Sequence, residues 1–441
     1  MKVLREEYQH FKESGGFEID INMKMDAIDD PFTLIPPADK MIVFLRQHIG
    51  KEAKLIVKEG DSIEFGQKLT DYGTDNTMIV PVHSPVDGIV VEIKKLMHPV
   101  SWKEENAIIL KTSGEGQKAP LEPINPDEES KEKLLRRVRE AGIVGLGGAA
   151  FPTYSKLLQK NNISHLIINN KESDPNIACD YRLIIEKPKE IIKGIKVMAK
   201  ILEVQNIIFA TRTKEGKIPD FEALLKENDI NLVHIKPKYS LGSERLLIKE
   251  VLNVELPSGK YPPDLGTVVH NVATAYAISR AIYKGEPLIS RGLTLYSKKT
   301  GGKNLWVRMG TPVGHIFSHL GVSSKNFNRI VFGSIMMGKS IPNPNSPILK
   351  ATSGITAFTK EESDPYANPL PCIRCGYCNT VCPVDIYPQL IMEAEKKGDV
   401  ERLRKLHVED CIECGLCSYV CPSRIRFTKF LTNGKNLVRN Q

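Results

Sequence analysis

Short alternating runs of apolar and polar residues mark the first part of the chain. From residue 57 to residue 93, apolar side chains alternate with polar ones around Gly60, Gly66 and Gly88. Short strands separated by Gly or Pro turns at this spacing are typical of a small antiparallel barrel or sandwich. The pattern predicts such a unit over residues 39–113. It follows an N-terminal extension, residues 1–38, in which we find no clear period.

The pattern changes after residue 131, where strands and helices alternate. Buried-strand patterns are separated by helical ones, which is typical of a parallel α/β sheet. We predict an α/β domain over residues 131–285, reached through an acidic, proline-containing linker at 118–129. The predicted strands are 165–169, 205–210 and 231–235, and the predicted helices are 190–201 and 220–227. Ligands bind at the carboxyl ends of such strands.

Two further units complete the chain. Residues 286–345 show strand patterns at 293–296, 305–309 and 329–332 and a helix at 312–320, which predicts a small β-grasp-like domain. Residues 362–435 contain most of the cysteines. Length, at 441 residues, predicts roughly three domains, whereas these patterns indicate four.

Eight of the nine cysteines lie in the last seventy residues and form one run twice. Each run reads C-x2-C-x2-C-x3-C-P, the pattern of two-cluster ferredoxins, in which the fourth Cys ligates the other cluster. We therefore predict two [4Fe–4S] clusters. Zinc favours two separated C-x2-C pairs, and a chain without an export signal is a poor candidate for disulfides. The expected groups are Cys372, Cys375, Cys378 with Cys421, and Cys411, Cys414, Cys417 with Cys382.

Helices are expected between and after the cysteine runs. Pro388, an apolar stripe and Gly398 predict a helix between them, so we expect a helical dicluster domain. Residues 422–441 contain five bases and no acid. They are either a solvated helical tail or a docking face for an acidic carrier or an anionic membrane.

Composition and charge limit the classes of function. The chain is 41% apolar and 26% charged, with a net charge of +8 that is too small to predict nucleic-acid binding. No apolar stretch reaches the ~20 residues of a membrane span, and the charged residues 1–10 do not predict a secretory signal. The barrel pattern resembles a lipoyl carrier, but no Lys occurs from Leu69 to Ile93 to bear the cofactor. We expect a docking module that is not lipoylated.

A glycine-rich loop precedes the first strand of the α/β domain. It contains Gly145, Gly147, Gly148, Phe151 and Lys156. Its spacing superficially matches a dinucleotide fingerprint, but a helix precedes it and Pro152 interrupts it, which fits that turn poorly. Glycines let main-chain N–H groups approach a phosphate, and a helix beginning near Thr153 would assist. The alternative is a tight structural turn.

The order of these segments resembles one known family. The glycine loop, residues 169–182, 239–248 and 268–274, the barrel before them and the cysteine runs after them are similar to the RnfC family of the Rnf electron-transport complex. That family is related to the flavin- and NADH-binding subunit of respiratory complex I. The resemblance implies FMN binding by Gly145, Gly147, Gly148, Lys156, Asn169, Asn271 and Thr274. It also implies NADH binding by Glu172, Asp174 and Glu244, of which Glu172 and Glu244 are the candidate catalytic residues. Phe151 is expected near the nicotinamide.

The implied function is electron transfer from NADH through FMN and two [4Fe–4S] clusters. The protein is expected to lie peripherally on the cytoplasmic face of the membrane. Its partners would be the integral-membrane and iron–sulfur subunits of an Rnf-type complex, and indirectly ferredoxin. Two alternatives remain: a soluble relative that delivers electrons to a cobalamin or another reductase, and a flavin-free electron-transfer scaffold. Cys179 is expected to be a small buried residue outside the redox groups.

Overall fold

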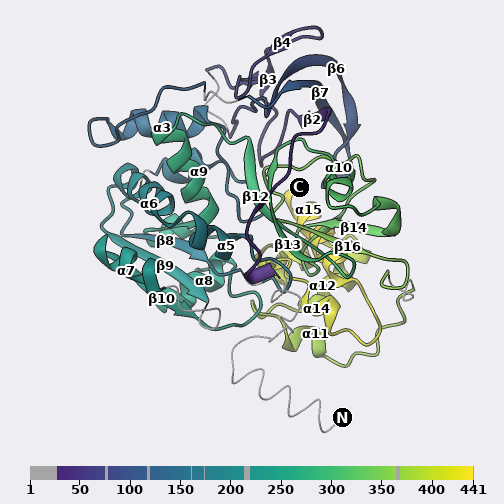
Figure 1. The fold of residues 1–441 in the computed structure, drawn as a ribbon. Helices are drawn as coiled ribbons and strands as arrows, with labels where there is room; N and C mark the ends of the chain where they lie inside the picture. The colour runs from purple at the N-terminus through teal and green to yellow at the C-terminus, as the bar shows by residue number, and fades with distance from the viewer. Residues whose placement is uncertain are drawn as a thin grey trace.

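The computed structural model describes residues 27–74, 78–116, 120–159, 161–172, 174–212, 219–363 and 368–440. Most of the N-terminal extension, the start of the predicted linker and residues 75–77 at the tip comparable to a carrier's lysine hairpin lie outside these ranges. Figure 1 shows the units in the order predicted, from the strands of the N-terminal half to the yellow helices near the C-terminus.

The N-terminal unit is an antiparallel barrel-sandwich. One sheet has the order β2-β7-β6-β4, and a second pairs β3 with β5. Alternate residues such as Met41, Val43, Val90 and Ile108 form its core. The apolar positions of the alternating sequence pattern are therefore the side chains that the strands bury. The strands are β2 (Lys40–Phe44), β3 (Lys54–Leu55), β4 (Ser62–Ile63), β5 (Thr70–Asp71), β6 (Asp87–Met97) and β7 (Glu104–Gly114).

The α/β domain has a four-stranded sheet of order β10-β9-β8-β11, in which all pairs are parallel. Its strands are β8 (His165–Asn170), β9 (Asn206–Arg212), β10 (Ile230–Ile235) and β11 (Thr267–Asn271). Its helices are α3 (Lys131–Glu140), α4 (Thr153–Leu157), α5 (Cys179–Glu186), α6 (Pro188–Leu202), α7 (Pro219–Glu227), α8 (Glu244–Leu252) and α9 (Val272–Tyr283).

Successive residues of the strands point to opposite faces of the sheet and pack against different helices. Leu166 and Ile168 pack in the cluster that contains α3, α6 and α9, whereas Ile167 packs with α8. Helices α6 and α9 approach closely at Gly194 of α6, where an added Cβ would lie 1.8 Å from the Ala275 oxygen of α9. Because both faces are covered, the middle residues of β8 (166–168) and of β9 (207–210) are buried and apolar, as the sequence predicted.

The third unit is a six-stranded sheet of order β1-β13-β12-β16-β14-β15. Its elements are β1 (Thr33–Leu34), β12 (Ser290–Ser297), β13 (Gly301–Arg308), α10 (Val313–His319), β14 (Arg329–Phe332), β15 (Lys339–Ser340) and β16 (Gly354–Phe358). The predicted range 286–345 therefore omits two strands. β16 lies between β12 and β14, and β1, from the N-terminal extension, pairs with β13.

The cysteine-rich unit is helical, as predicted. Its helices are α11 (Tyr377–Thr380), α12 (Pro388–Lys396), α13 (Val400–Lys405), α14 (Leu416–Tyr419) and α15 (Phe427–Arg439), and it has a 3-10 turn at Val408–Asp410. Two further 3-10 turns lie in the preceding units, at Pro262–Leu265 and Ser324–Asn326. The basic C-terminal segment forms α15, whose Phe427, Leu431 and Val438 are buried. That helix is thus partly a packed element of the unit.

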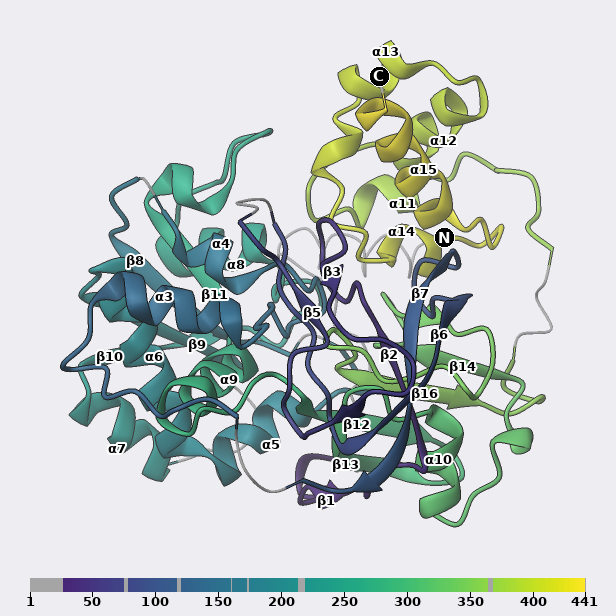
Figure 2. The ribbon, with the colours of Figure 1, turned by 90° about the horizontal axis from the view of Figure 1, so that it is seen from above.

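Figure 2 shows the helical cysteine-rich unit above the β-rich half of the molecule. It touches both neighbouring units through one apolar cluster, in which Tyr239 of the α/β domain and Met336 of the six-stranded unit pack against Cys414 and Leu416. Within the described ranges, no helix combines the length and the apolar content that crossing a bilayer takes.

Candidate functional site

The glycine loop connects α3 to α4 and is closed at its base. Gly145 N–H donates to the Phe151 oxygen at 2.8 Å, and Thr153 N–H donates to the Ile143 oxygen at 3.2 Å. Gly148 has φ +106°, a conformation that side chains with a Cβ rarely adopt. The helix expected near Thr153 is present, but α4 has only five residues. Helix α4 is too short for its dipole to hold an anion. Any anion at this site would therefore be bound by the N–H groups of the loop itself.

Strands β8 and β11 bring two predicted FMN residues together. The strands are neighbours, and Asn169 pairs in register with Asn271. Because β9 lies on one side of β8 and β11 on the other, this is the point where strand order reverses, the usual ligand site of an open α/β sheet. Asn169 donates to the Gly242 oxygen at 2.8 Å. Asn271 caps α9 by accepting from Ala273 N–H, and it donates to Asp180.

A cavity of about 180 Å³ lies at this point. Its lining includes five of the predicted residues, Gly147, Asn169, Glu172, Asp174 and Asn271. It also includes Ile412 and Cys414 from the second cysteine run. The predicted flavin site and one predicted cluster site therefore share a wall.

The remaining predicted residues lie around this cavity rather than in its lining. Thr274 accepts from Leu146 N–H at 3.0 Å and so supports the glycine loop. Gly145 and Phe151 form the closed base of the loop. Lys156 and Glu244 contact each other, and the Lys156 ammonium also donates to the Val269 oxygen at 2.7 Å. These assignments to FMN and NADH stay predictions.

Two effects act in opposite directions on the charge of Lys156. Burial lowers the pKa of Lys156 to about 7. The adjoining carboxylate acts in the opposite direction, because an opposite charge favours the protonated amine. Since the two side chains are 21% and 40% exposed, solvent screens their attraction.

Glu172 has a structural role in addition to its place in the cavity. Its carboxylate accepts from Asp180 N–H at 2.9 Å and from Tyr181 N–H at 3.2 Å, at the start of α5. Its oxygen lies within 4.8 Å of ligand atoms of Cys179 and Asp180. Since N–H donors and Asn271 occupy these carboxylates, the group does not offer a metal site. Cys179 is 2% exposed, as expected of a buried residue, and burial raises the pKa of its thiol.

The eight C-terminal cysteines form the two groups expected from their spacing. Cys372, Cys375, Cys378 and Cys421 line one cavity of about 400 Å³. In the other group, Cys411, Cys414 and Cys417 lie close enough to one another and to Cys382 to affect one another's charge. The fourth cysteine of each run thus lies with the other run. Their ligation of clusters stays a prediction.

The two cysteine runs have the same backbone conformation. Arg374 and Glu413, each two residues after the first Cys, have φ 53° and 54°, and Gly376 and Gly415 have φ 82° and 84°. This turn directs N–H groups at sulfur. Arg374 N–H donates to Cys372 Sγ at 3.4 Å, and Glu413 N–H donates to Cys411 Sγ at 3.3 Å.

The cysteine sulfurs of the described residues are not gathered as tightly as the four thiolates of a zinc site. Four thiolates around zinc lie about 4 Å apart. In the described part of the chain, no three cysteine sulfurs lie within 4.8 Å of one another. Burial raises the pKa of Cys378 and Cys411 to about 11 and that of Cys414 to about 12. Thiolates at these positions would therefore need a bound metal cation to compensate for the lost solvation.

Sequence patterns predicted no role for three buried residues, one lining the cavity and two contacting the glycine loop. Tyr239, which is 2% exposed, donates its hydroxyl to the Cys414 oxygen at 2.7 Å. Burial, with Asp174 and Cys414, raises the pKa of this tyrosine. Arg291 and Lys350 are almost completely buried beside the glycine loop. In the sequence, Arg291 and Lys350 are each marked only as a single cationic residue within a largely apolar segment.

Three family models match the chain. They are the RnfC barrel sandwich hybrid domain over residues 12–115, the Nuo51 FMN-binding domain over 138–280 and the 4Fe-4S dicluster domain over 364–422. These matches confirm the predicted barrel-sandwich, flavin-binding and dicluster domains, and they support FMN and iron–sulfur clusters as cofactors.

Curated relatives match nearly the whole chain. The C subunit of the ion-translocating oxidoreductase complex of Haemophilus influenzae strain Rd is 36% identical over 396 residues, covering 88% of this chain and 48% of that protein. The protein of the same name from Rhodobacter capsulatus is 35% identical over 408 residues, covering 90% and 78%. This chain thus spans about half the length of the Haemophilus relative.

A solved structure has a similar fold. The NAD+-reducing [NiFe]-hydrogenase in the H2-reduced state aligns with a TM-score of 0.50 at 15% identity, over 72% of this chain and 62% of that chain. At this identity the similarity concerns the fold alone.

Proposed function

This chain belongs to the RnfC family, the C subunits of ion-translocating oxidoreductase complexes, and on that basis we propose that it is a peripheral redox subunit of such a complex. In this role it takes hydride from NADH onto FMN and passes single electrons through two [4Fe–4S] clusters to partner subunits. Its place is the cytoplasmic side of the membrane, with integral-membrane and iron–sulfur subunits as partners and ferredoxin as an indirect one.

Bound FMN would supply the conversion of a two-electron hydride into single electrons. The chain's own residues bind and orient the reactants. In the proposal, the glycine loop, Lys156, Asn169 and Asn271 hold FMN at the strand-order reversal, with Thr274 supporting the loop. Glu172, Asp174 and Glu244 face the nicotinamide nucleotide, and Phe151 packs near its ring.

The main support for the proposal is the shared wall of the flavin cavity. Cys414 lines the same cavity as Asn169 and Asn271, and the Tyr239 hydroxyl holds the cysteine loop there. The group containing Cys411 and Cys414 therefore lies next to the flavin site. In the other group, Cys372 and Cys375 are exposed. The geometry supports an order in which electrons pass from the flavin to the group with Cys411 and Cys414. They then leave through the group with Cys372 and Cys375.

A matched pair of cysteine variants tests this order. Cys411→Ala and Cys372→Ala remove equivalent positions of the two runs. After anaerobic purification, NADH is added and the reduced cluster is followed by electron paramagnetic resonance. We expect the cluster that remains in Cys372→Ala to be reduced by NADH. The one that remains in Cys411→Ala should be reduced by dithionite but only slowly by NADH. The reverse result would contradict the order.

Co-purification separates the membrane-complex function from that of a soluble reductase. The tagged chain should bring down integral-membrane subunits in a mild detergent. Recovery of the chain with only a soluble cobalamin-binding or other reductase partner would favour the alternative function.

A further inference from the structure

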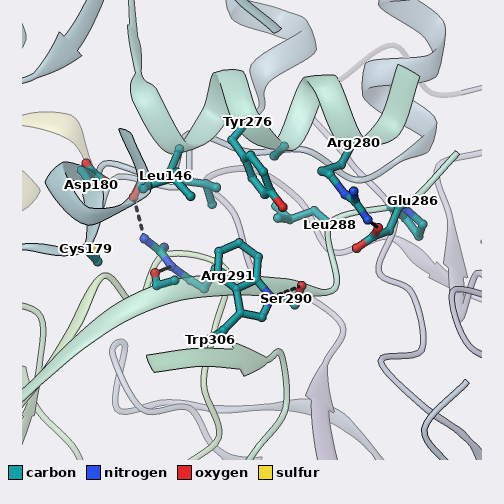
Figure 3. Close-up of a pocket in the computed structure, with 15 residues that line it drawn as sticks. Leu146, Cys179, Asp180, Tyr276, Arg280, Glu286, Leu288, Ser290, Arg291 and Trp306 are labelled. Atoms are coloured by element: carbon teal, nitrogen blue, oxygen red, sulfur yellow. Dashed lines mark hydrogen bonds and ion pairs between the residues drawn. The ribbon is translucent and has the colours of Figure 1, made fainter. Parts of the chain in front are cut away.

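Arg291, at the start of β12, reaches the glycine loop from the six-stranded unit. It is 2% exposed. Its guanidinium donates to the Leu146 oxygen at 3.1 Å and to the Lys350 oxygen at 2.5 Å. Figure 3 shows the side chain directed at Leu146, with Asp180 and Cys179 beside it. A fully buried guanidinium is costly to desolvate, so its hydrogen bond to the Leu146 carbonyl of a second unit requires an explanation.

Lys350 binds the other end of the same loop. It is 1% exposed, and its ammonium donates to the Gly142 oxygen at 2.7 Å and to the Pro81 oxygen at 3.0 Å. Its main-chain N–H donates to Gln47 Oε1 at 3.1 Å. Two buried cations from outside the α/β domain thus hold carbonyls at both ends of the loop segment 142–146.

Holding a carbonyl fixes the direction of the following N–H. In a planar trans peptide the C=O and the N–H point in opposite directions. Because the Leu146 oxygen faces Arg291, the Gly147 N–H points away from Arg291, and Gly147 lines the cavity proposed for the flavin. The Leu146 N–H, which belongs to the preceding peptide, donates to Thr274, so the peptides on both sides of Leu146 are each held by one hydrogen bond.

The N–H groups that follow are available to a ligand. In the described part of the chain, no hydrogen-bond acceptor is found for the N–H groups of Gly147, Gly148 or Ala149. Successive N–H groups at a glycine turn form a concave site for an anion. Flavin mononucleotide carries one such anion, its phosphate monoester, whereas riboflavin lacks it.

We propose that Arg291 and Lys350 are positioning residues, which hold the carbonyls of the glycine loop so that its N–H groups receive the phosphate of FMN. The inference rests on the proposed function, because it requires FMN in this cavity. Neither residue touches the cofactor itself. Each acts through a main-chain carbonyl. The alternative to a positioning role is that the two residues stabilise only the packing of the units against each other.

Comparing FMN with riboflavin separates these two roles. The full chain, purified anaerobically with its clusters, is depleted of flavin and titrated with each compound. We expect Arg291→Met to weaken FMN binding about tenfold to a hundredfold, the range for hydrogen bonds to a charged group. Its riboflavin binding should stay within about threefold of the unaltered protein. Lys350→Met should act in the same direction.

Arg280→Met is the matched control. Arg280 lines the same small cavity as Arg291, but it pairs with Glu286 rather than with the loop. Its replacement should change FMN and riboflavin affinities equally. Arg291→Lys keeps a cation and should lose less FMN affinity than Arg291→Met. If Arg291→Met fails to fold, as its iron content will show, the lysine variant gives the same comparison.

The outcomes are distinct. Equal losses of FMN and riboflavin affinity in the Arg291 variants, or no loss of either, overturn the positioning role. An unaltered protein that binds FMN no more tightly than riboflavin also overturns it, while leaving flavin binding itself in place. An unaltered protein that binds neither flavin overturns the proposed function instead.

Discussion

The contact between Lys156 and Glu244 predicts that Glu244→Gln strengthens FMN binding and weakens NADH binding. In the ligand-free protein the lysine touches this carboxylate, so a phosphate must compete for it. With side chains 21% and 40% exposed, the pair contributes about 0.5–1 kcal/mol. Removing the competing charge should therefore lower the dissociation constant of FMN about twofold to fivefold.

The assay is quenching of flavin fluorescence on titration into flavin-depleted protein, with NADH binding measured separately on the reloaded protein. Glu250→Gln is the matched control, because Glu250 lies exposed on the same helix, α8. Lys156→Ala should weaken FMN binding, and the combined variant should show no further gain from the Glu244 change. Weaker FMN binding by Glu244→Gln, or full additivity of the two changes, would show that the carboxylate and the phosphate do not compete for this lysine.

Three other predictions concern pH, packing and the cavity wall. Because burial lowers the pKa of Lys156 to about 7, the amine loses its proton as pH rises above 7; FMN affinity should fall from pH 7 to pH 9, and Lys156→Met should abolish that fall. In Gly194→Ala the new Cβ lies 1.8 Å from the Ala275 oxygen, so the free energy of unfolding measured with urea should decrease by about 1–3 kcal/mol; an unchanged midpoint would contradict the packing. Tyr239→Phe leaves the buried Cys414 oxygen without its donor, at a cost of about 1–3 kcal/mol. The cluster beside the cavity should then be lost sooner on exposure to air than the exposed one, as followed by electron paramagnetic resonance.

Local patterns were enough to predict most elements of the fold. The helix predicted at 190–201 is α6, Pro188–Leu202, because its apolar period and its N-terminal proline are both local. The strand predicted at 231–235 is β10, Ile230–Ile235. The grouping of cysteines followed from spacing alone, because a loop of seven residues restricts where three sulfurs can lie.

Contacts between distant segments were not predictable in this way. β1 is only Thr33–Leu34, too short to show a period, and its pairing with β13 depends on tertiary packing. Neither Arg291 nor Lys350 belongs to a motif, and each binds main-chain carbonyls, which leave no trace in the partner's sequence. The place of Cys414 in the lining of the proposed flavin cavity likewise depends on how two units pack.

The proposed electron path runs from NADH through a flavin to the clusters of this one chain. The most direct test is a titration of the anaerobically purified protein with NADH, followed by visible absorbance, after iron and flavin have been quantified. We predict one FMN and about eight irons per chain, with the absorbance of flavin and clusters lost together on addition of NADH. Loss of cluster absorbance with a reduced partner protein, but not with NADH, would contradict this path.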